Sequence, residues 1–488
     1  MTLLQSSKLS SYRTSSLMNA VDLAFTPALE QARLIRSREI SPLELAELYL
    51  ERIERLNPLL GSYFTVMAEA AIATAKAQTE QLSQTSPNEL PPFFGVPISI
   101  KDLTPVAGEC CSYGLSVAKK RVAKEDAGIV TRLRQAGFVL LGKTATSEIG
   151  STPFTEPRGF PPARNPWNPD YTPGGSSGGA AASVAAGLAA IAQGTDGGGS
   201  IRGPAFCCGL VGLKPSRGRV SLAPVGDRLN GLSTDGPIAR TVADAAALLD
   251  VMAGYTVGDP YWLPDPEPSF LAATERSPGR LRIGYTTDFS PVGSADAACT
   301  QAVMATVKRL EALGHTVEPV QINLNQLVEP LIAVWQTGVD VGVPWFVMGK
   351  LNRWLYWRSR KRSAGQFLTA VNQMQVAARQ IVATLLPYDA TVLPVFLHPT
   401  IRVGEWAKLP AHKMFQHIAH WVAPSPILNA TGQPGIAIPT GFTENGLPIG
   451  VQLVGRPADE VTLISLAAQL EQDQPWIQHR PAIATAED

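Results

Sequence analysis

A single serine behind three glycines is the feature of this sequence best suited to covalent chemistry. In the segment GTDGGGSIRGP, Ser200 follows Gly197, Gly198 and Gly199. Ordering a run of glycines costs backbone entropy. We therefore expect the run to serve a function that side chains would prevent, such as close approach of another group to the backbone. Without side chains, several N–H groups can converge on one point, as an oxyanion hole requires. The segment therefore predicts a serine nucleophile with oxyanion donors on the same loop.

A reactive serine needs a proton acceptor, and the usual acceptor is histidine. The first histidine is His315, far along the chain from Ser200. Lys101 is an alternative because it ends the apolar segment VPISI, where burial can lower a lysine pKa from about 10.4 towards neutrality. Spacing alone equally allows an exposed lysine. Ser176, in GGSSGG, is separated from Ser200 by one expected helix and one expected strand, so the two glycine loops can meet in one site.

The segment GGSSG (174–178) also matches G-x-S-x-G, the nucleophile elbow of α/β-hydrolases. That elbow follows a strand directly, whereas the preceding NPWNPDYTPG is interrupted by prolines. The elbow mechanism needs a downstream histidine, and composition leaves it open. For each downstream histidine, packing in the core or on the surface is the simpler expectation; these are His398, His412, His417, His420 and His479.

Residues Gly137–Thr144 match the phosphate-loop pattern G-x-x-x-x-G-K-T. A phosphate loop must be flexible, but the residues between its two glycines are Phe, Val, Leu and Leu, which have the pattern of a strand. Nucleotide binding here is therefore only a remote alternative.

The elements around these motifs alternate between strands and helices. The segment SPLE (41–44) is a capping box that opens a helix expected to run to about Leu56 and to stop at Pro58. Strands are expected at Val96–Ile100 and Phe138–Gly142, with a helix at Ala127–Gly137 between them. Later strands are expected in RIGYTT, HTVEPV, TVLPV and IGVQLVG. This alternation predicts an α/β protein.

The run Gly174–Ser216 resembles the core of the amidase signature family. The similarity extends to FFGVPISIKDL, LLGKTATSEIG, ARNPWNPDYTPGG, GPIARTVADAA, NATGQPGIAIP and LPIGVQLVG. It implies a mixed, mostly parallel twisted sheet covered on both faces by helices. It also implies one domain over residues 25–482, with a signature core at about 94–220, after a tail at 1–24.

In that family a Ser-Ser-Lys triad hydrolyses amides. The resemblance implies that Ser200 is the acyl nucleophile, that Ser176 is the bridging serine after a cis peptide bond, and that Lys101 is the base. It implies no metal and no cofactor. Three further residues match the signature as supports of the site: Ser177, Asp196 and Arg202.

The chain departs from the family pattern at two glycines. Gly197 and Gly203 stand where larger residues are common, and they are expected to widen the site. The alternative within the family is the glutamine-hydrolysing subunit of a tRNA-dependent amidotransferase. Such subunits commonly show SIRQPA, whereas this chain has SIRGPA.

Composition and cysteine spacing limit the binding partners and the cellular compartment that we expect. The net charge is zero, so no overall field favours nucleic acid or an anionic membrane. The five cysteines form no C-x-x-C pair, which argues against a zinc or redox site and for a reducing compartment. The N-terminus lacks a signal-peptide core, and the apolar run 180–192 is too short for a membrane span. We expect a cytoplasmic enzyme with a small-molecule amide substrate, and a homodimer remains open.

The segment 325–425 matches no motif of the family. Six of the nine tryptophans lie between Trp335 and Trp421, and Arg353–Arg362 mixes basic and aromatic residues. Such a run can bind nucleic acid or a membrane surface, although a helix with one solvated face is the simpler expectation. The hypothesis is that this variable segment forms the wall of an apolar acyl pocket, because ligand pockets are mostly apolar. The alternative is that its tryptophans only pack it onto the core.

Overall fold

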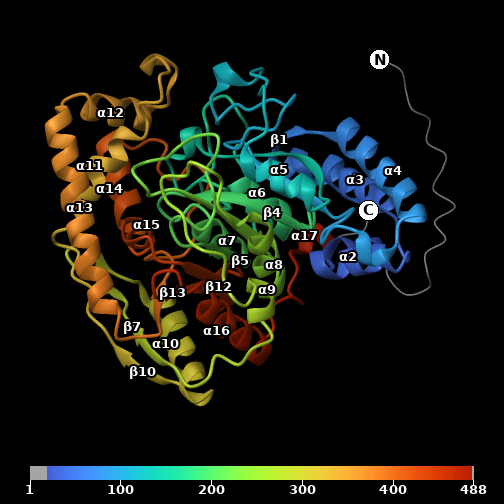
Figure 1. Ribbon diagram of the computed structural model, residues 1–488. Coiled ribbons are helices and arrows are strands. Elements are labelled where there is room, and N and C mark those ends of the chain that lie inside the picture. Colours follow the sequence, from blue (N-terminus) through green and yellow to red (C-terminus); the bar gives the residue numbers. More distant parts are fainter. Residues whose placement is uncertain (1–18, 486–488) are drawn as a thin grey trace.

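The computed structural model describes residues 19–485, and one eleven-stranded sheet runs through it (Figure 1). The strands, in their spatial order, are β1 (Tyr63–Val66), β3 (Val139–Thr144), β2 (Pro97–Lys101), β4 (Ile191–Asp196), β6 (Thr234–Ala239), β5 (Val211–Lys214), β12 (Gly435–Phe442), β13 (Pro448–Gly455), β11 (Ala390–Pro394), β7 (Arg282–Tyr285) and β10 (Thr316–Pro319). The short strands β8 (Asp288–Phe289) and β9 (Gly293–Ser294) form a separate pair.

The sheet is mixed, as expected, but it is not mostly parallel. Four neighbouring pairs are parallel, and six are antiparallel. One antiparallel pair, β12 and β13, is a hairpin joined only by the short turn 443–447, whereas others, such as β4 and β6, form between strands that have a helix between them in the sequence. Parallel neighbours need a longer crossover connection, and a list of strands and helices does not say which strands become neighbours.

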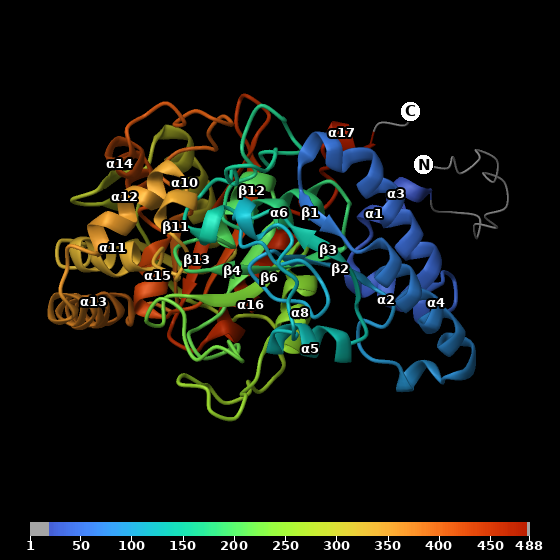
Figure 2. The same cartoon turned by 90° about the horizontal axis from the view of Figure 1, so that it is seen from above.

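Helices cover both faces of the sheet, since α6 and α8 lie on opposite sides of β4 and β6 (Figure 2). The helices are α1 (Ala20–Phe25), α2 (Ala28–Arg36), α3 (Pro42–Leu60), α4 (Ala68–Gln84), α5 (Gly128–Gln135), α6 (Gly178–Ala185), α7 (Arg202–Cys208), α8 (Val242–Met252), α9 (Phe270–Ala273), α10 (Ala297–Ala312), α11 (Val328–Thr337), α12 (Lys350–Ser359), α13 (Ala364–Leu385), α14 (Ala411–Trp421), α15 (Pro426–Thr431), α16 (Glu460–Asp473) and α17 (Ala482–Thr485). Helices α2–α4 lie at one end of the molecule and α11–α14 at the other. Among the described residues, no helix is both long and apolar enough to cross a membrane.

The expected strands and helices around the motifs are confirmed, apart from one boundary. Helix α3 begins with the capping box of Ser41 and Glu44, but it continues through Pro58 to Leu60. Proline interrupts a helix by removing one N–H donor and by crowding the preceding turn. Here Pro58 stands in the last turn, where little helix remains to be disrupted, and Gly61 in a left-handed conformation ends the helix instead.

The expected N-terminal tail at 1–24 is too long. Residues 1–18 lie outside the described residues, but 20–24 belong to α1, which is capped by the Asn19 side chain. Phe25 at the end of α1 is buried, and the guanidinium groups of Arg52 and Arg240 lie over its ring. An aromatic anchor of this kind ties the segment to the body of the protein.

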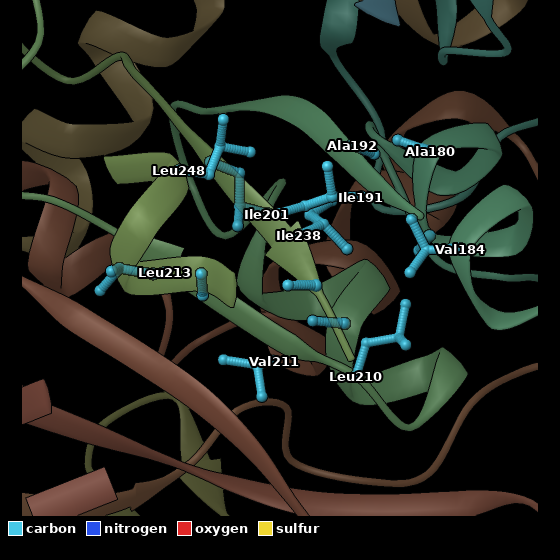
Figure 3. Close-up of a cluster of buried hydrophobic side chains, with 14 of the residues drawn as sticks. Ala180, Val184, Ile191, Ala192, Ile201, Leu210, Val211, Leu213, Ile238 and Leu248 are labelled. Atoms are coloured by element: carbon cyan, nitrogen blue, oxygen red, sulfur yellow. The ribbon is translucent and has the colours of Figure 1, made fainter. Parts of the chain in front are cut away.

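The two glycine loops rest on a tightly packed core. Figure 3 shows Val184 of α6, Ile191 of β4, Ile201 beside α7 and Ile238 of β6 in one cluster. All four side chains are completely buried. Protein interiors pack as densely as crystals. The packed helix α6 and strand β4 therefore fix the positions of the two glycine loops, one just before α6 and one just after β4.

Candidate active site

Lys101 is the last residue of β2 and is completely buried. Its Nζ atom lies 2.7 Å from Ser176 Oγ, 2.8 Å from Ser177 Oγ and 2.8 Å from Thr195 Oγ1. Burial lowers the pKa of Lys101 to about 7, although nearby Asp196 and Asp235 favour the charged form. The lysine is therefore not the exposed residue that spacing alone allowed, and at neutral pH a large fraction of it carries a free lone pair.

The backbone around Lys101 is fixed by two buried side chains. Gln193 Oε1 accepts a hydrogen bond from the Lys101 N–H at 3.1 Å, while Gln193 Nε2 donates to Asp235 at 2.6 Å. The adjacent Asp102 forms a buried ion pair with Lys143 at 3.0 Å. Lys101 thus leaves the strand in a position that its neighbours determine.

That ion pair also excludes the phosphate-loop interpretation. Strand β3 spans Val139–Thr144, so the middle of the apparent loop is a fully buried strand. Lys143, which would have to reach a phosphate, is completely buried against Asp102. The segment Gly137–Thr144 therefore has neither the free amides nor the free lysine that nucleotide binding needs.

Ser176 and Ser177 stand at the start of α6 and join the two glycine loops. The Gly175–Ser176 peptide bond is cis, as expected. The Ser177 N–H donates to the carbonyl of Ser200 at 3.3 Å, and Ser177 Oγ donates to the carbonyl of Thr195. Lys101, Ser176 and the loop of Ser200 are thereby brought into one site, although they are far apart in the sequence.

The loop of Ser200 is held by the carboxylate of Asp196. Asp196 accepts from the N–H groups of Gly199 at 2.7 Å and Ile201 at 3.2 Å, and it pairs with the Arg202 guanidinium at 3.0 Å. Burial alone would raise the pKa of Asp196, but Arg202 holds it well below its usual range. Asn429 of α15 also donates to Asp196, at 2.9 Å. Asp196 and Arg202 thus hold the loop of Ser200 in place, and their expected supporting role in catalysis stays a prediction.

These contacts change which backbone N–H groups are expected to act as oxyanion donors. The Gly199 N–H points to Asp196, so it is occupied. Within residues 19–485, the amides of Gly197, Gly198 and Ser200 have no acceptor. Those three amides, rather than those of Gly197, Gly198 and Gly199, are the donors that a substrate oxygen can use.

Asp196→Asn is expected to lower kcat by about 100-fold. The substitution would let the loop of Ser200 shift, and a misplacement of about 1 Å at a catalytic group can reduce the rate by that factor. Breaking the buried pair with Arg202 is expected to cost about 3–5 kcal/mol of stability. Urea unfolding and steady-state kinetics measure the two effects. Asp244→Asn is the matched control, since Asp244 is a buried carboxylate that holds the N–H groups of Ala28 and Leu29. Equal kcat losses in both variants would mean that Asp196 acts only through stability.

A pocket of about 160 Å³ opens at Ser200. No charged side chain lines it among the described residues. Eleven of its 23 lining residues come from the variable segment: Leu327, Val328, Leu331, Ile332, Trp335, Phe396, Phe415, Ile418, Ala419, Val422 and Ala423. The expectation that this segment forms an apolar wall agrees with this lining.

The tryptophans, however, mostly do not form the pocket. Of the six in the variable segment, only Trp335 lines it. A Cβ atom on Gly198 would come within 3.1 Å of the Trp335 ring, so this indole lies directly against the glycine loop. Trp421 is completely buried and packs on Phe396 and Trp406 instead. Aliphatic side chains form most of the wall. Such residues are common throughout the sequence, so they do not mark a pocket as clearly as a cluster of tryptophans does.

The expectation that Gly203 widens the site is wrong. A Cβ atom at Gly203 would lie 2.2 Å from the Phe396 ring, so this ring already fills the space that a larger residue would take. At Gly197 the nearest atoms to an added Cβ are Leu229 at 3.4 Å and Trp335 at 3.7 Å. Because Gly203 has no side chain, the Phe396 ring can pack directly against it, and the pocket is not wider there.

The nucleophile-elbow alternative finds no support in the geometry. Ser176 contacts Lys101, and none of the six histidines, all within the described residues, lines the pocket of Ser200. His398 and His417 stack on Trp421 and Trp406. No strand precedes GGSSG, which also agrees with the proline-rich sequence there.

Sequence reasoning missed Thr195, Gln193 and Asn429. Thr195 contacts the lysine amine, and Gln193 and Asn429 support the lysine and the glycine loop. Thr195 stands beside Asp196 in the glycine-rich motif, so its position was a usable signal. Gln193 looked like an ordinary strand residue, and Asn429 lies in another segment of the chain, so their roles depend on tertiary contacts.

Known proteins resemble this chain over nearly its whole length. The family model described as Amidase matches residues 44–341 and 346–464. A Synechocystis sp. protein described as an amidase is 47% identical, with 92% of this chain and 89% of that protein covered. The 6-aminohexanoate-cyclic-dimer hydrolase of Paenarthrobacter ureafaciens is 34% identical, with 96% and 98% covered. A solved structure of 6-aminohexanoate cyclic dimer hydrolase with its substrate superposes with a TM-score of 0.87 at 31% identity, covering 95% of this chain and 100% of that one.

Proposed function

This chain belongs to the amidase signature family and hydrolyses carboxylic amides at C–N bonds other than peptide bonds, and we propose that its substrates carry an apolar acyl group. The observation behind this proposal is the uncharged, mostly aliphatic pocket at Ser200. An apolar acyl chain gains free energy on leaving water for such a pocket.

The proposed reaction begins at Ser200. Neutral Lys101 accepts the proton of Ser176 Oγ, and Ser176 in turn accepts the proton of Ser200 Oγ as the latter attacks the amide carbon. The 2.7 Å contact between Lys101 and Ser176 supports the first transfer, because proton transfer needs hydrogen-bond reach. The free amides of Gly197, Gly198 and Ser200 stabilise the resulting oxyanion.

The second half of the reaction reverses these transfers. When the C–N bond breaks, Ser176 protonates the leaving amine and recovers its proton from Lys101. Water then attacks the acyl-Ser200 ester, and the same relay removes its proton. As the ester C–O bond breaks, the relay returns a proton to Ser200 Oγ, which releases the acid and leaves Lys101 neutral again. No step needs a group other than the residues named and water.

The alternative, hydrolysis of glutamine for an amidotransferase, suits this pocket poorly. Glutamine carries an α-ammonium and an α-carboxylate, and burying a charge without a partner is costly. The lining of the pocket offers neither charge a counter-ion. The five free cysteines support the further proposal that the enzyme works in the reducing cytoplasm.

A series of straight-chain amides tests the proposed substrate class. Each added methylene is worth about 0.8 kcal/mol, so kcat/KM is expected to rise about fourfold per carbon until the pocket is full. Steady-state kinetics with acetamide, butanamide, hexanamide, benzamide and glutamine measure it. Trp335→Leu is expected to move the optimum to longer chains. The control Trp167→Leu, outside the pocket, is expected to leave it in place. A flat series, or a preference for glutamine, would contradict the apolar acyl pocket.

A further inference from the structure

An exposed group of apolar side chains lies between α11 and the end of α12. We call it the aromatic cap; it consists of Val341, Trp345, Phe346 and Trp357. Phe346 is 61% exposed, Trp357 50% and Trp345 40%. The ring of Trp345 lies 5.9 Å from that of Phe346 and 5.6 Å from that of Trp357, so the three rings form one continuous patch. Contiguous exposed apolar surface of this kind usually marks a site of interaction.

Basic residues surround the aromatic cap. In residues 341–362 there are six Lys or Arg residues and no Asp or Glu, although the whole chain is neutral. Arg358, Arg360, Lys361 and Arg362 are exposed. Arg360 pairs with Asp340 at 3.0 Å, and Asp340 is the acidic residue immediately before this stretch. The cap therefore combines an apolar centre with neighbouring basic residues that outnumber the acidic Asp340 and Glu329.

The cap lies beside the wall of the catalytic pocket. Helix α12 packs on α11 and α14 at the periphery of the molecule (Figure 1). A second cavity of about 250 Å³ between these helices is lined by Trp354, Arg358 and Arg362, and also by the acidic Glu329. It shares the lining residues Ile332 and Phe415 with the catalytic pocket, so the two cavities are neighbours.

We propose that the aromatic cap docks this enzyme on an anionic lipid surface. Aromatic rings favour the interface between lipid headgroups and acyl chains, and Lys and Arg beside them are attracted to anionic lipids. The exposed rings insert, while the neighbouring basic residues contact the headgroups. Docking is separate from the reaction proposed above and does not depend on it, but it would place the wall of the apolar pocket close to dissolved lipophilic amides.

A second copy of the chain fits this surface less well. In a two-fold dimer the same patch meets itself, so the basic residues of both copies, which outnumber the nearby acidic Asp340 and Glu329, would face each other. Anionic lipid supplies the opposite charge to these basic residues, and the charge pattern therefore favours it.

Vesicle flotation tests the proposal. The protein is expected to float with vesicles of phosphatidylcholine containing 30% phosphatidylglycerol (roughly the anionic content that basic segments recognise), and not with phosphatidylcholine alone. Trp345→Ser/Phe346→Ser is expected to weaken binding about tenfold or more, and Arg360→Gln/Lys361→Gln/Arg362→Gln is expected to abolish its dependence on the anionic lipid. Val257→Ser/Trp262→Ser is the matched control, because these side chains are 92% and 61% exposed elsewhere.

Several outcomes would overturn the proposal. These are no flotation, equal flotation with both vesicle types, or equal loss in the control variant. Cap-dependent binding to duplex DNA without flotation would assign the surface to nucleic acid. A dimer in sedimentation that the cap variants dissociate would assign it to a second copy. Hydrolysis of soluble hexanamide by the cap variants should match wild type, so a failure of docking and a failure of the amidase proposal are separately visible.

Discussion

Ser200→Ala is expected to lower kcat by roughly 10⁴–10⁶-fold, the range seen when a nucleophilic serine is removed from a catalytic relay. Ser200 lies at the pocket mouth beside free amides, and its carbonyl contacts the loop of Ser176. Without its hydroxyl, no acyl-enzyme can form. The rate is measured with hexanamide, and the covalent step with a serine-reactive fluorophosphonate and mass spectrometry of the labelled peptide.

Ser183→Ala is the matched control for Ser200. Ser183 is a completely buried serine of α6 whose hydroxyl donates to the Ala180 carbonyl and lies 3.1 Å from that of Ser99. Its loss should alter stability and leave labelling of Ser200 intact. Labelling that persists in Ser200→Ala, or that maps to Ser176, would assign the nucleophile to another residue.

Lys101→Met is expected to lower kcat/KM by roughly 10³–10⁴-fold while the protein stays folded. Methionine matches the apolar stem of lysine but cannot accept a proton. General-base catalysis contributes about 10²–10⁴-fold, and here the base also orients Ser176 through the 2.7 Å contact. Activity and near-ultraviolet circular dichroism separate a catalytic loss from an unfolding loss.

The pH dependence gives an independent test of Lys101. Its pKa is lowered by burial to about 7, so kcat/KM should fall as pH drops below 7 and Lys101 becomes protonated. In the unfolded chain lysine keeps its ordinary pKa of about 10.4. Between pH 7 and 10 the unfolded state therefore binds more protons, and stability should rise with pH in that window. Lys101→Met should reduce this rise and remove the acid limb of the activity profile.

Lys214→Met is the matched control, because Lys214 is also fully buried with a pKa lowered by burial to about 7. Its Nζ atom donates to the carbonyl of Pro215 and contacts no serine. This variant should change the stability profile in the same direction and keep the acid limb. An acid limb near pH 7 that survives in Lys101→Met would assign the base to a different group.

The sequence by itself determined the local elements and the chemistry-bearing residues. Capping boxes, apolar runs and glycine loops act over a few residues, so they predicted α3, β2, β3, α5 and α6. The resemblance to the amidase signature family named Lys101, Ser176 and Ser200 as catalytic candidates, and their roles stay predictions. The apolar character of the variable segment was likewise readable from composition, since burial follows apolar surface.

Only the tertiary structure decided how these parts meet. Strand order, and with it the excess of antiparallel pairs, depends on which strands become neighbours after the chain has turned. The lowered pKa of Lys101 depends on its complete burial, and the occupation of the Gly199 amide depends on the position of Asp196. Phe396, which fills the space at Gly203, and Trp335, which lies on Gly198, are far away in sequence. Such contacts join segments more than a hundred residues apart, and no local pattern encodes them because they result from packing the whole chain at once.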